Sequence, residues 1–144
     1  MPSKALWPDL DRQHPNSLKR IESEERRRPS IDTARRDGES YTAYTASGTT
    51  SVSYKAAHVH KITLTGSITP TFSGATSGIA CGLTLYLVQG GSGSYTVTWP
   101  SSVLFPGGND PTLSTTVGAT DVVVMETVDG GVSWFANLAG KAYA

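Results

Sequence analysis

Three things are scarce in this 144-residue sequence: cysteine, long apolar runs and, beyond residue 40, charged side chains. Cys81 is the only cysteine, which excludes a disulfide within the chain, and its apolar neighbours favour a buried thiol. No apolar run approaches the roughly 20 residues that cross a membrane, and no secretory signal follows Met1. We therefore expect a protein that is made in a cytoplasm and does not insert into a membrane.

The charges that are present lie mainly at the start of the chain. Residues 1–40 hold 17 of the 24 charged side chains, and the formal net charge of the whole chain is zero. Zero net charge gives no indication of nucleic-acid binding. A charge-rich segment with few apolar residues does not fold alone and is suited to lying on a partner. We predict a charged N-terminal arm, residues 1–40, followed by one folded domain, residues 41–144.

The arm contains one segment with the features of a helix. Ser17 is a good N-cap, Glu and Arg follow at i,i+4 spacing, and Pro29 ends the segment, which predicts a helix from Ser17 to about Arg28. The arm is therefore expected to be extended and partly helical, and the alternative is a disordered tail. The candidate residues for anchoring it to a neighbouring subunit are Trp7, Leu10, Leu18 and Ile21.

From Tyr41 onward the sequence has the short alternating patterns of β-strands. Asp129 and Gly130 between two apolar segments predict a hairpin, because a tight primed turn requires positive φ. Seven or eight short strands with close turns are typical of an all-β domain, here a single antiparallel β-sandwich or jelly-roll. The predicted strands are residues 41–45, 51–54, 58–65, 83–88, 95–99, 122–127 and 132–135.

The predicted domain offers few groups for acid–base or nucleophilic catalysis. Its carboxylates are Asp110, Asp121, Glu126 and Asp129. Asp110 and Asp129 lie in turn sequences, where aspartate has a structural role. Glu126 alternates with Val124, so it is expected to face solvent. The sequence has no nucleophile elbow and no phosphate-binding glycine loop. We therefore predict that the protein is not an enzyme.

His58 and His60 have the spacing of a pair of metal ligands on a strand. Residues two apart on a strand point the same way, so both imidazoles are expected on one face. Three copies around a threefold axis would supply six nitrogens, a set suited to a divalent transition metal. The metal hypothesis therefore requires a trimer, and the alternative is a pair of solvated or packed histidines without any cofactor.

Aromatic side chains form a second candidate site. Their rings could stack on sugars or contact another surface, and Trp99, Phe105 and Trp134 are the first candidates for this contact. The alternative is that these rings belong to the core of the domain. The aromatic residues considered for this role are Tyr86, Tyr95, Trp99, Phe105, Trp134 and Phe135.

Several short motifs follow one another through the domain. They are Ile62–Ser73 (ITLTGSITPTFS), Leu83–Leu87 (LTLYL), Thr96–Pro100 (TVTWP), Phe105–Gly108 (FPGG) and Asp129–Trp134 (DGGVSW). In this order, over roughly residues 58–143, they resemble small β modules at the C-termini of tailed-bacteriophage tail fibres, minor tail proteins and related appendages. The resemblance implies a non-catalytic, homotrimeric virion protein held to the particle by its N-terminal segment. It also implies iron as the metal for His58 and His60, since some phage spikes bind iron through such pairs.

Three functions are therefore considered. The first is a trimeric tail fibre or minor tail component of a virion, anchored on other virion proteins by residues 1–40 and contacting a glycan on the host surface. The second is a head decoration protein whose arm threads between capsid subunits. The third is a monomeric carbohydrate-binding module. The first two imply a protein made in the host cytoplasm and located in the virion.

Overall fold

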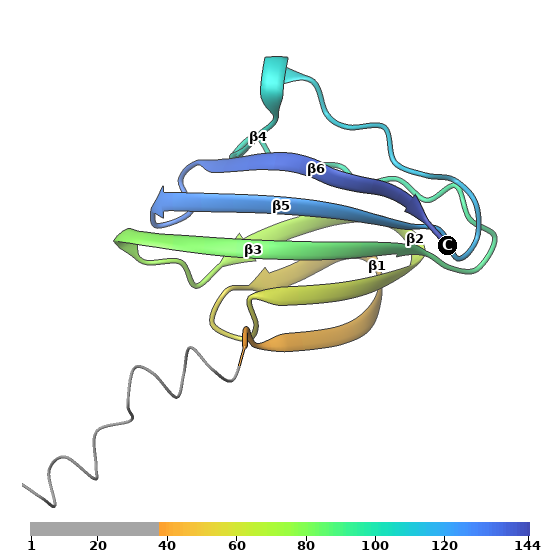
Figure 1. The fold of residues 1–144 in the computed structure, drawn as a ribbon, viewed down its shortest axis with the longest axis horizontal. Coiled ribbons are helices and arrows are strands. Elements are labelled where there is room, and N and C mark those ends of the chain that lie inside the picture. Colours follow the sequence, from red (N-terminus) through yellow and green to blue (C-terminus); the bar gives the residue numbers. More distant parts are fainter. Residues whose placement is uncertain (1–37) are drawn as a thin grey trace, which may run out of the picture. The chain divides into compact units, whose positions relative to one another are not determined.

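The domain that follows the charged arm consists of β-strands. The computed structural model describes residues 38–144, so the predicted helix and the anchoring candidates Trp7, Leu10, Leu18 and Ile21 lie outside the described residues. Six strands make one mixed sheet in the order β1-β2-β3-β5-β6-β4 (Figure 1). The strands are β1 (Tyr41–Ser53), β2 (Val59–Ser73), β3 (Ser77–Gln89), β4 (Val103–Leu104), β5 (Thr120–Asp129) and β6 (Trp134–Tyr143). The prediction of an all-β domain is confirmed.

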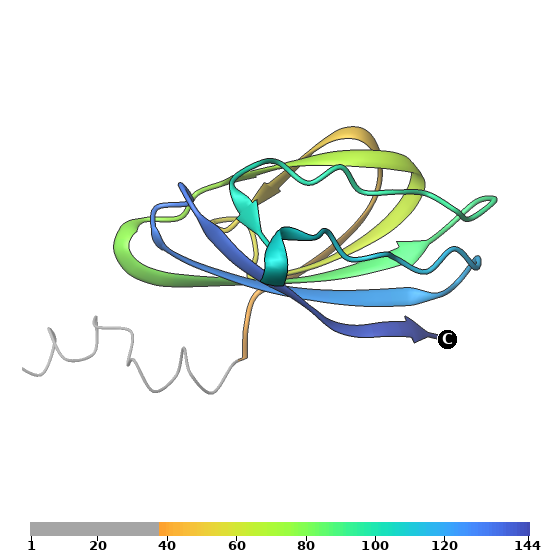
Figure 2. The same cartoon turned by 90° about the horizontal axis from the view of Figure 1, so that it is seen from above.

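The first three strands are parallel neighbours, and the chain winds round once between each strand and the next; this winding of β1–β3 is here called the coil. Tyr41 pairs with Val59, and Val59 in turn pairs with Thr84 on β3. Parallel neighbours usually need a crossover of about a dozen residues, yet only residues 54–58 connect β1 to β2. The chain can return over so short a link because β1 and β2 bend along their own length, as Figure 2 shows.

Small residues form the corner at which β1 and β2 bend. The register of the two strands shifts between Ala46 and Gly48, and Gly48 has φ of +66°, a conformation that favours glycine. On the neighbouring strand, a Cβ added at Gly66 would lie 3.0 Å from the Cβ of Ser47. The close approach of the two backbones therefore depends on the missing side chain of Gly66.

The hairpin predicted at Asp129 joins β5 to β6 and is confirmed. β5 and β6 are antiparallel, with Glu126 paired to Phe135. Residues 130–133 connect them, and the Asp129 carboxylate accepts hydrogen bonds from the Ser133 amide (2.9 Å) and the Thr127 hydroxyl (2.8 Å). The connection is longer than a two-residue turn, and the Asp129 side chain holds it together.

The prediction of an antiparallel sheet is wrong for three of the five strand pairs. β3, β5 and β6 are antiparallel neighbours, whereas β1–β2, β2–β3 and β4–β6 are parallel pairs. The predicted strands 41–45 and 51–54 are the two ends of the bent strand β1, and the predicted strand 95–99 is reduced to one bridge between Val97 and Ile68. Alternation along a segment indicates its buried face but carries no information about the direction of its neighbours.

Alternate positions of the central strands supply the hydrophobic core. Leu83, Leu85 and Leu87 of β3 are at most 2% exposed, as is Trp134, the largest of the fully buried side chains. Full burial of one such leucine stabilises the fold by about 1.5–3 kcal/mol. The positions between the buried ones face outward, and they carry the candidate site. The buried core also contains Ala46, Val52, Ile62, Leu64, Ile68, Trp99, Val103, Phe105, Val123, Met125 and Ala136.

The long connection between β3 and β5 contains β4 and a short 3-10 turn, η1 (Pro106–Gly108). β4 pairs with β6 at one edge of the sheet, while β1 forms the other edge. Within residues 38–144, no helix has the length and apolar content needed to span a bilayer.

Candidate functional site

One row of paired residues crosses four strands on the outer face of the sheet. Lys61 of β2 pairs with Tyr86 of β3, Tyr86 pairs with Val122 of β5, and Val122 pairs with Gly140 of β6. The chain neighbours of Lys61, Tyr86 and Val122, such as Leu85, are buried. Because successive side chains of a strand point to opposite faces, the row points away from the core.

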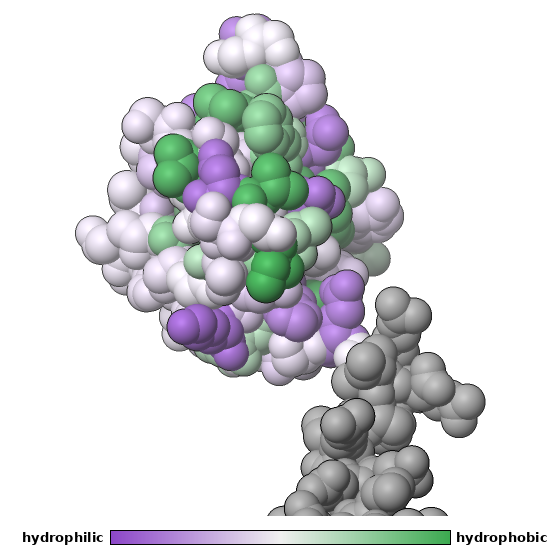
Figure 3. All heavy atoms as spheres, turned by 90° about the vertical axis from the view of Figure 1, so that its left-hand side faces the viewer, coloured by the Kyte–Doolittle hydropathy of each residue, from purple (hydrophilic) through white to green (hydrophobic). Residues whose placement is uncertain are grey.

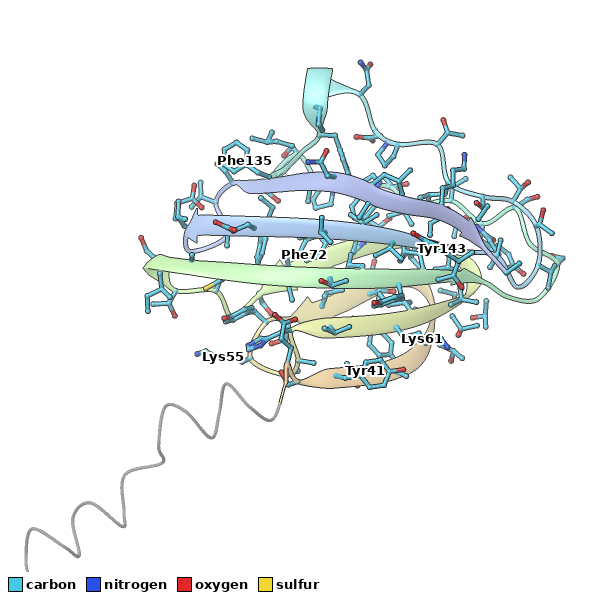
Figure 4. The ribbon with its side chains drawn as sticks, in the orientation of Figure 1. Tyr41, Lys55, Lys61, Phe72, Phe135 and Tyr143 are labelled. Atoms are coloured by element: carbon cyan, nitrogen blue, oxygen red, sulfur yellow. The ribbon has the colours of Figure 1, made fainter. Side chains whose placement is uncertain are left out.

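Lys61, Tyr86 and Val122 of this row form the floor of an open groove of about 630 Å³, here called the tyrosine groove. Tyr41 stands on its β1 side and Tyr143 on its β6 side, and these two side chains are 60% and 58% exposed, against 38% for Tyr86. Figure 4 shows Tyr143, Lys61 and Tyr41 across the strands at one end of the sheet, with Phe135 at the other end. The lining residues are Tyr41, Lys61, Tyr86, Gly118, Thr120, Val122, Ala139, Tyr143 and Ala144.

The position of Tyr143 follows from an irregularity in β6. The register between β5 and β6 shifts on both sides of Val122, and Ala142 adopts φ of +59°, which is unusual for a residue with a side chain. The Tyr143 ring lies over Gly140, where the Cβ of any other residue would clash with it. The irregular segment therefore turns the ring of Tyr143 back across the sheet and into the groove.

Asp121 holds this irregular segment from inside the domain. Its carboxylate is 2% exposed, and its Oδ1 accepts hydrogen bonds from the Ala142 amide (2.8 Å) and the Ser114 hydroxyl (2.6 Å). Its Oδ2 accepts one from the Ser114 amide (2.5 Å). Hydrogen bonds from amide groups offset the cost of burying a carboxylate. Asp121 is therefore a positioning residue, which acts on the groove through Ala142 and Tyr143.

The groove combines apolar ring faces with hydroxyl groups and one charged side chain. Among the described residues that line it, Lys61 is the one charged side chain, and it is exposed to solvent. The three tyrosines each present a ring and a hydroxyl, and Thr120 adds a further hydroxyl. Such a surface can stack against an apolar ring face and exchange hydrogen bonds at the rim of that ring.

His60, one of the two candidate metal ligands, belongs to the interior of the domain. It is 1% exposed, its Nε2 lies 2.9 Å from the Ala57 carbonyl oxygen, and its Nδ1 lies 3.2 Å from the Tyr44 hydroxyl. An uncharged ring in this position donates from Nε2 and accepts at Nδ1. Burial raises the pKa of Tyr44, which keeps its hydroxyl available as the donor.

His58 lies just before β2 and is partly buried. Its ring stacks on that of Tyr54, with centroids 4.5 Å apart. Within residues 38–144, no three His, Cys, Asp or Glu side chains form a group able to hold a metal. A shared metal at His58 and His60 stays a prediction, and it would require His60 to give up one of its hydrogen bonds inside the domain.

The predicted surface contact by Trp99, Phe105 and Trp134 is wrong, because all three side chains are in the core. Trp99 is 9% exposed, Phe105 7% and Trp134 1%. The rings of Trp99 and Phe105 meet edge to face at 5.2 Å, and Trp134 packs against Phe72 at 5.7 Å. Large apolar rings contribute most when they are buried, which is the alternative that the sequence left open.

The remaining carboxylates do not converge on the groove. The Ser133 amide and then the Thr127 hydroxyl lower the pKa of Asp129 below its ordinary value. Glu126 is exposed and lies between Gly82 and Phe135 on the neighbouring strands. These positions are consistent with structural roles, while the expectation that the protein is not an enzyme stays a prediction.

Sequence reasoning found part of the groove. Tyr86 is among the aromatic candidates, whereas nothing in the sequence singles out Lys61. Tyr41 and Tyr143 were missed, because only the strand order brings β1 and β6 to the same groove as β3. Comparisons with protein-family models, curated proteins and solved structures find no match for this chain.

Proposed function

We propose that the protein is a non-catalytic structural component of a tailed-bacteriophage virion, a trimeric tail fibre or minor tail protein. Residues 1–40 anchor it on other virion proteins, and the β domain is displayed at the host surface. The observation that carries this proposal is the contrast between the charge-rich arm and a domain with seven charged side chains beyond residue 40. The order of motifs that resembles phage appendage modules adds support.

The use of polar groups within the domain also supports a display role. Asp121, Asp129 and His60 make hydrogen bonds that hold loops and strands in place. The tyrosine groove is open to solvent and lined by side chains suited to binding. We further propose that the bent strands pack as the two layers of a β-sandwich, with the buried core between them.

An exposed apolar patch supports the trimer. Ile79, Val128, Val132 and Phe135 are 54–74% exposed and gather at the end of the sheet that carries the β5–β6 connection (Figure 3). Exposed apolar side chains that cluster in this way are typical of contacts between proteins. In the proposed trimer this patch is covered by a neighbouring copy.

Two other functions remain as alternatives. A head decoration protein would use the same arm, and only its position on the particle distinguishes it. A monomeric carbohydrate-binding module is favoured by the tyrosine groove and would need no arm for its activity.

The test is the location of the chain in purified particles. Particles from the cells that produce the protein are isolated on a density gradient, their tails and heads are separated, and peptides of this chain are measured by mass spectrometry. We expect the chain in the tail fraction, and we expect a variant without residues 1–40 to be absent from particles. Recovery of the full-length chain in the soluble fraction alone would contradict the proposal, and recovery with heads would favour the decoration protein.

A further inference from the structure

We propose that the tyrosine groove binds a saccharide that carries a carboxylate group, such as an oligomer of uronic acids. This inference deepens the proposed function, because display at a host surface would supply the saccharide. Binding itself depends only on the groove, so it can be tested on the purified full-length protein.

The shape and chemistry of the groove fit a sugar. A pyranose ring has apolar C–H faces and a rim of hydroxyls, so it needs flat aromatic surfaces beside hydrogen-bonding groups. Tyr41, Tyr86 and Tyr143 supply both from three different strands. Gly118 and Ala139 also line the groove, and they leave space beside these rings because they contribute little or no side chain.

The contrast with the apolar patch argues against a second copy in the groove. Ile79, Val128 and Val132 present aliphatic groups without hydroxyls, and these suit a dry contact between proteins. Each large ring of the groove instead carries a hydroxyl group. The two exposed areas lie at opposite ends of the sheet, as Phe135 and Tyr143 show in Figure 4, so they can serve different partners.

Charge complementarity selects an acidic sugar. Lys61 stands at the β2 end of the row, and its paired neighbours Ala43 and Tyr86 are uncharged. No Asp or Glu side chain of the described residues lines the groove. The ammonium group is therefore available for a carboxylate of the ligand, and a charge-assisted hydrogen bond is stronger than one between neutral groups.

The experiment measures binding of the full-length protein to immobilised tetrasaccharides of galacturonate, glucuronate and mannuronate. Their methyl esters are the matched neutral ligands, because they keep the rings and hydroxyls and lose the charge. We expect binding to at least one acidic tetrasaccharide and about tenfold weaker binding to its ester. Added salt should weaken only the binding of the acid.

Two groove variants and two matched controls locate the site. Tyr41→Ala and Lys61→Gln should each weaken acid binding about tenfold, and Lys61→Gln should also abolish the preference for acid over ester. Leu104→Ala and Lys55→Gln remove an exposed apolar side chain and an exposed lysine that lie away from the groove and are not among the residues of the apolar patch, and they should leave acid binding unchanged. Thermal unfolding of each variant checks folding, and Tyr41 lies on an edge strand, where its loss costs little.

Several results would overturn the inference. They are failure to bind every acidic tetrasaccharide, equal binding of acid and ester, and unchanged binding after Tyr41→Ala and Lys61→Gln. Loss of the native oligomer in Tyr41→Ala, without saccharide binding by the wild type, would identify the groove as a contact between copies. Failure of the proposed function is separate: a chain that binds the acid but is absent from particles refutes only the virion assignment.

Discussion

The coil of β1–β3 and the hairpin of β5 and β6 belong to one sheet but are specified in different ways. In the coil, paired residues such as Tyr41 and Val59 are separated by a complete turn of the chain. In the hairpin, Glu126 pairs with Phe135 across a short connection. The residues of the turn therefore define the hairpin. The coil forms only if β1 and β2 bend at matching positions and keep the register in which their residues pair.

Each region also relies on a different polar residue. The buried ring of His60 joins Tyr44 of β1 to the carbonyl of Ala57 in the link between strands. In the hairpin, the Asp129 carboxylate holds the turn near the surface. Asp121 ties the end of β6 to the loop before β5. We therefore expect substitutions in the buried coil and at Asp121 to cost more than those in the hairpin turn.

The largest effect is expected for Asp121→Ala. The substitution leaves the buried amide and hydroxyl of Ser114 without an acceptor and removes the acceptor of the Ala142 amide. Buried unsatisfied donors such as those of Ser114 lower the free energy of unfolding by about 3 kcal/mol or more in total. Urea denaturation measures the change. Asp110→Ala, in an exposed loop, is the matched control and should stay within about 0.5 kcal/mol of the wild type. Equal effects of the two substitutions would contradict the role given to Asp121.

His60→Ala should have the next largest effect and should separate the two regions. Loss of the ring removes its hydrogen bonds and leaves a cavity, at a cost of about 2–4 kcal/mol. Hydrogen exchange should show faster exchange of β1 and β2 amides than of hairpin amides. His58→Ala, which loses one stacking contact with Tyr54, should cost about 1 kcal/mol. Uniform loss of protection across both regions would show that the coil has no separate stability.

Gly48→Ala tests the bend that allows the coil. A Cβ at Gly48 meets no atom within 4 Å, so the cost comes from its φ of +66° and should be about 1–2 kcal/mol. Gly82→Ala, at an exposed position of β3 with ordinary φ, should leave stability unchanged or raise it by about 0.5 kcal/mol. Thermal denaturation compares the two variants. A Gly48→Ala protein as stable as Gly82→Ala would contradict the claim that the bend depends on the positive φ of Gly48.

The smallest effect is expected for Asp129, and it depends on pH. Hydrogen bonds from Ser133 and Thr127 lower the folded-state pKa of Asp129 below its ordinary value of 3.8. Its stabilising contribution is therefore present above pH 3.8 and is lost as the pH falls through the lower, folded-state pKa. Asp129→Asn should lower stability slightly near neutral pH and should flatten the fall of stability in acid. Urea denaturation across the acid range measures this, and parallel acid profiles for wild type and variant would contradict it.

The hairpin and the buried faces of the strands could be predicted because their signals are local. Asp129 and Gly130 mark the turn, and the alternation of Leu83, Leu85 and Leu87 marks the inner face of β3. The parallel coil could not be predicted, since β1 reads as two short strands and nothing in its pattern indicates a bend at Gly48.

The candidate site depends on the same nonlocal information. Tyr86 and Lys61 are outward positions of two recognisable strands, but their pairing is set by the coil. Tyr143 enters the groove through an irregular β6 that is held by Asp121. The sequence does not show that Trp99 and Trp134 are buried, because an aromatic residue in an alternating pattern can lie in the core or on the surface.

The measurement that tests the coil, and with it the groove, is a pair of engineered cysteines at Thr45 and Thr63. These residues pair across β1 and β2, and the backbones of neighbouring strands lie about 4.8 Å apart, within disulfide range. In a Cys81→Ala background, mild oxidation should form a disulfide in Thr45→Cys/Thr63→Cys and none in the control Thr45→Cys/Thr71→Cys, since Thr71 pairs with Ser51. A disulfide in the control pair alone, or in neither pair, would contradict the parallel pairing of β1 with β2. Tyr41 and Lys61 would then not line the same groove.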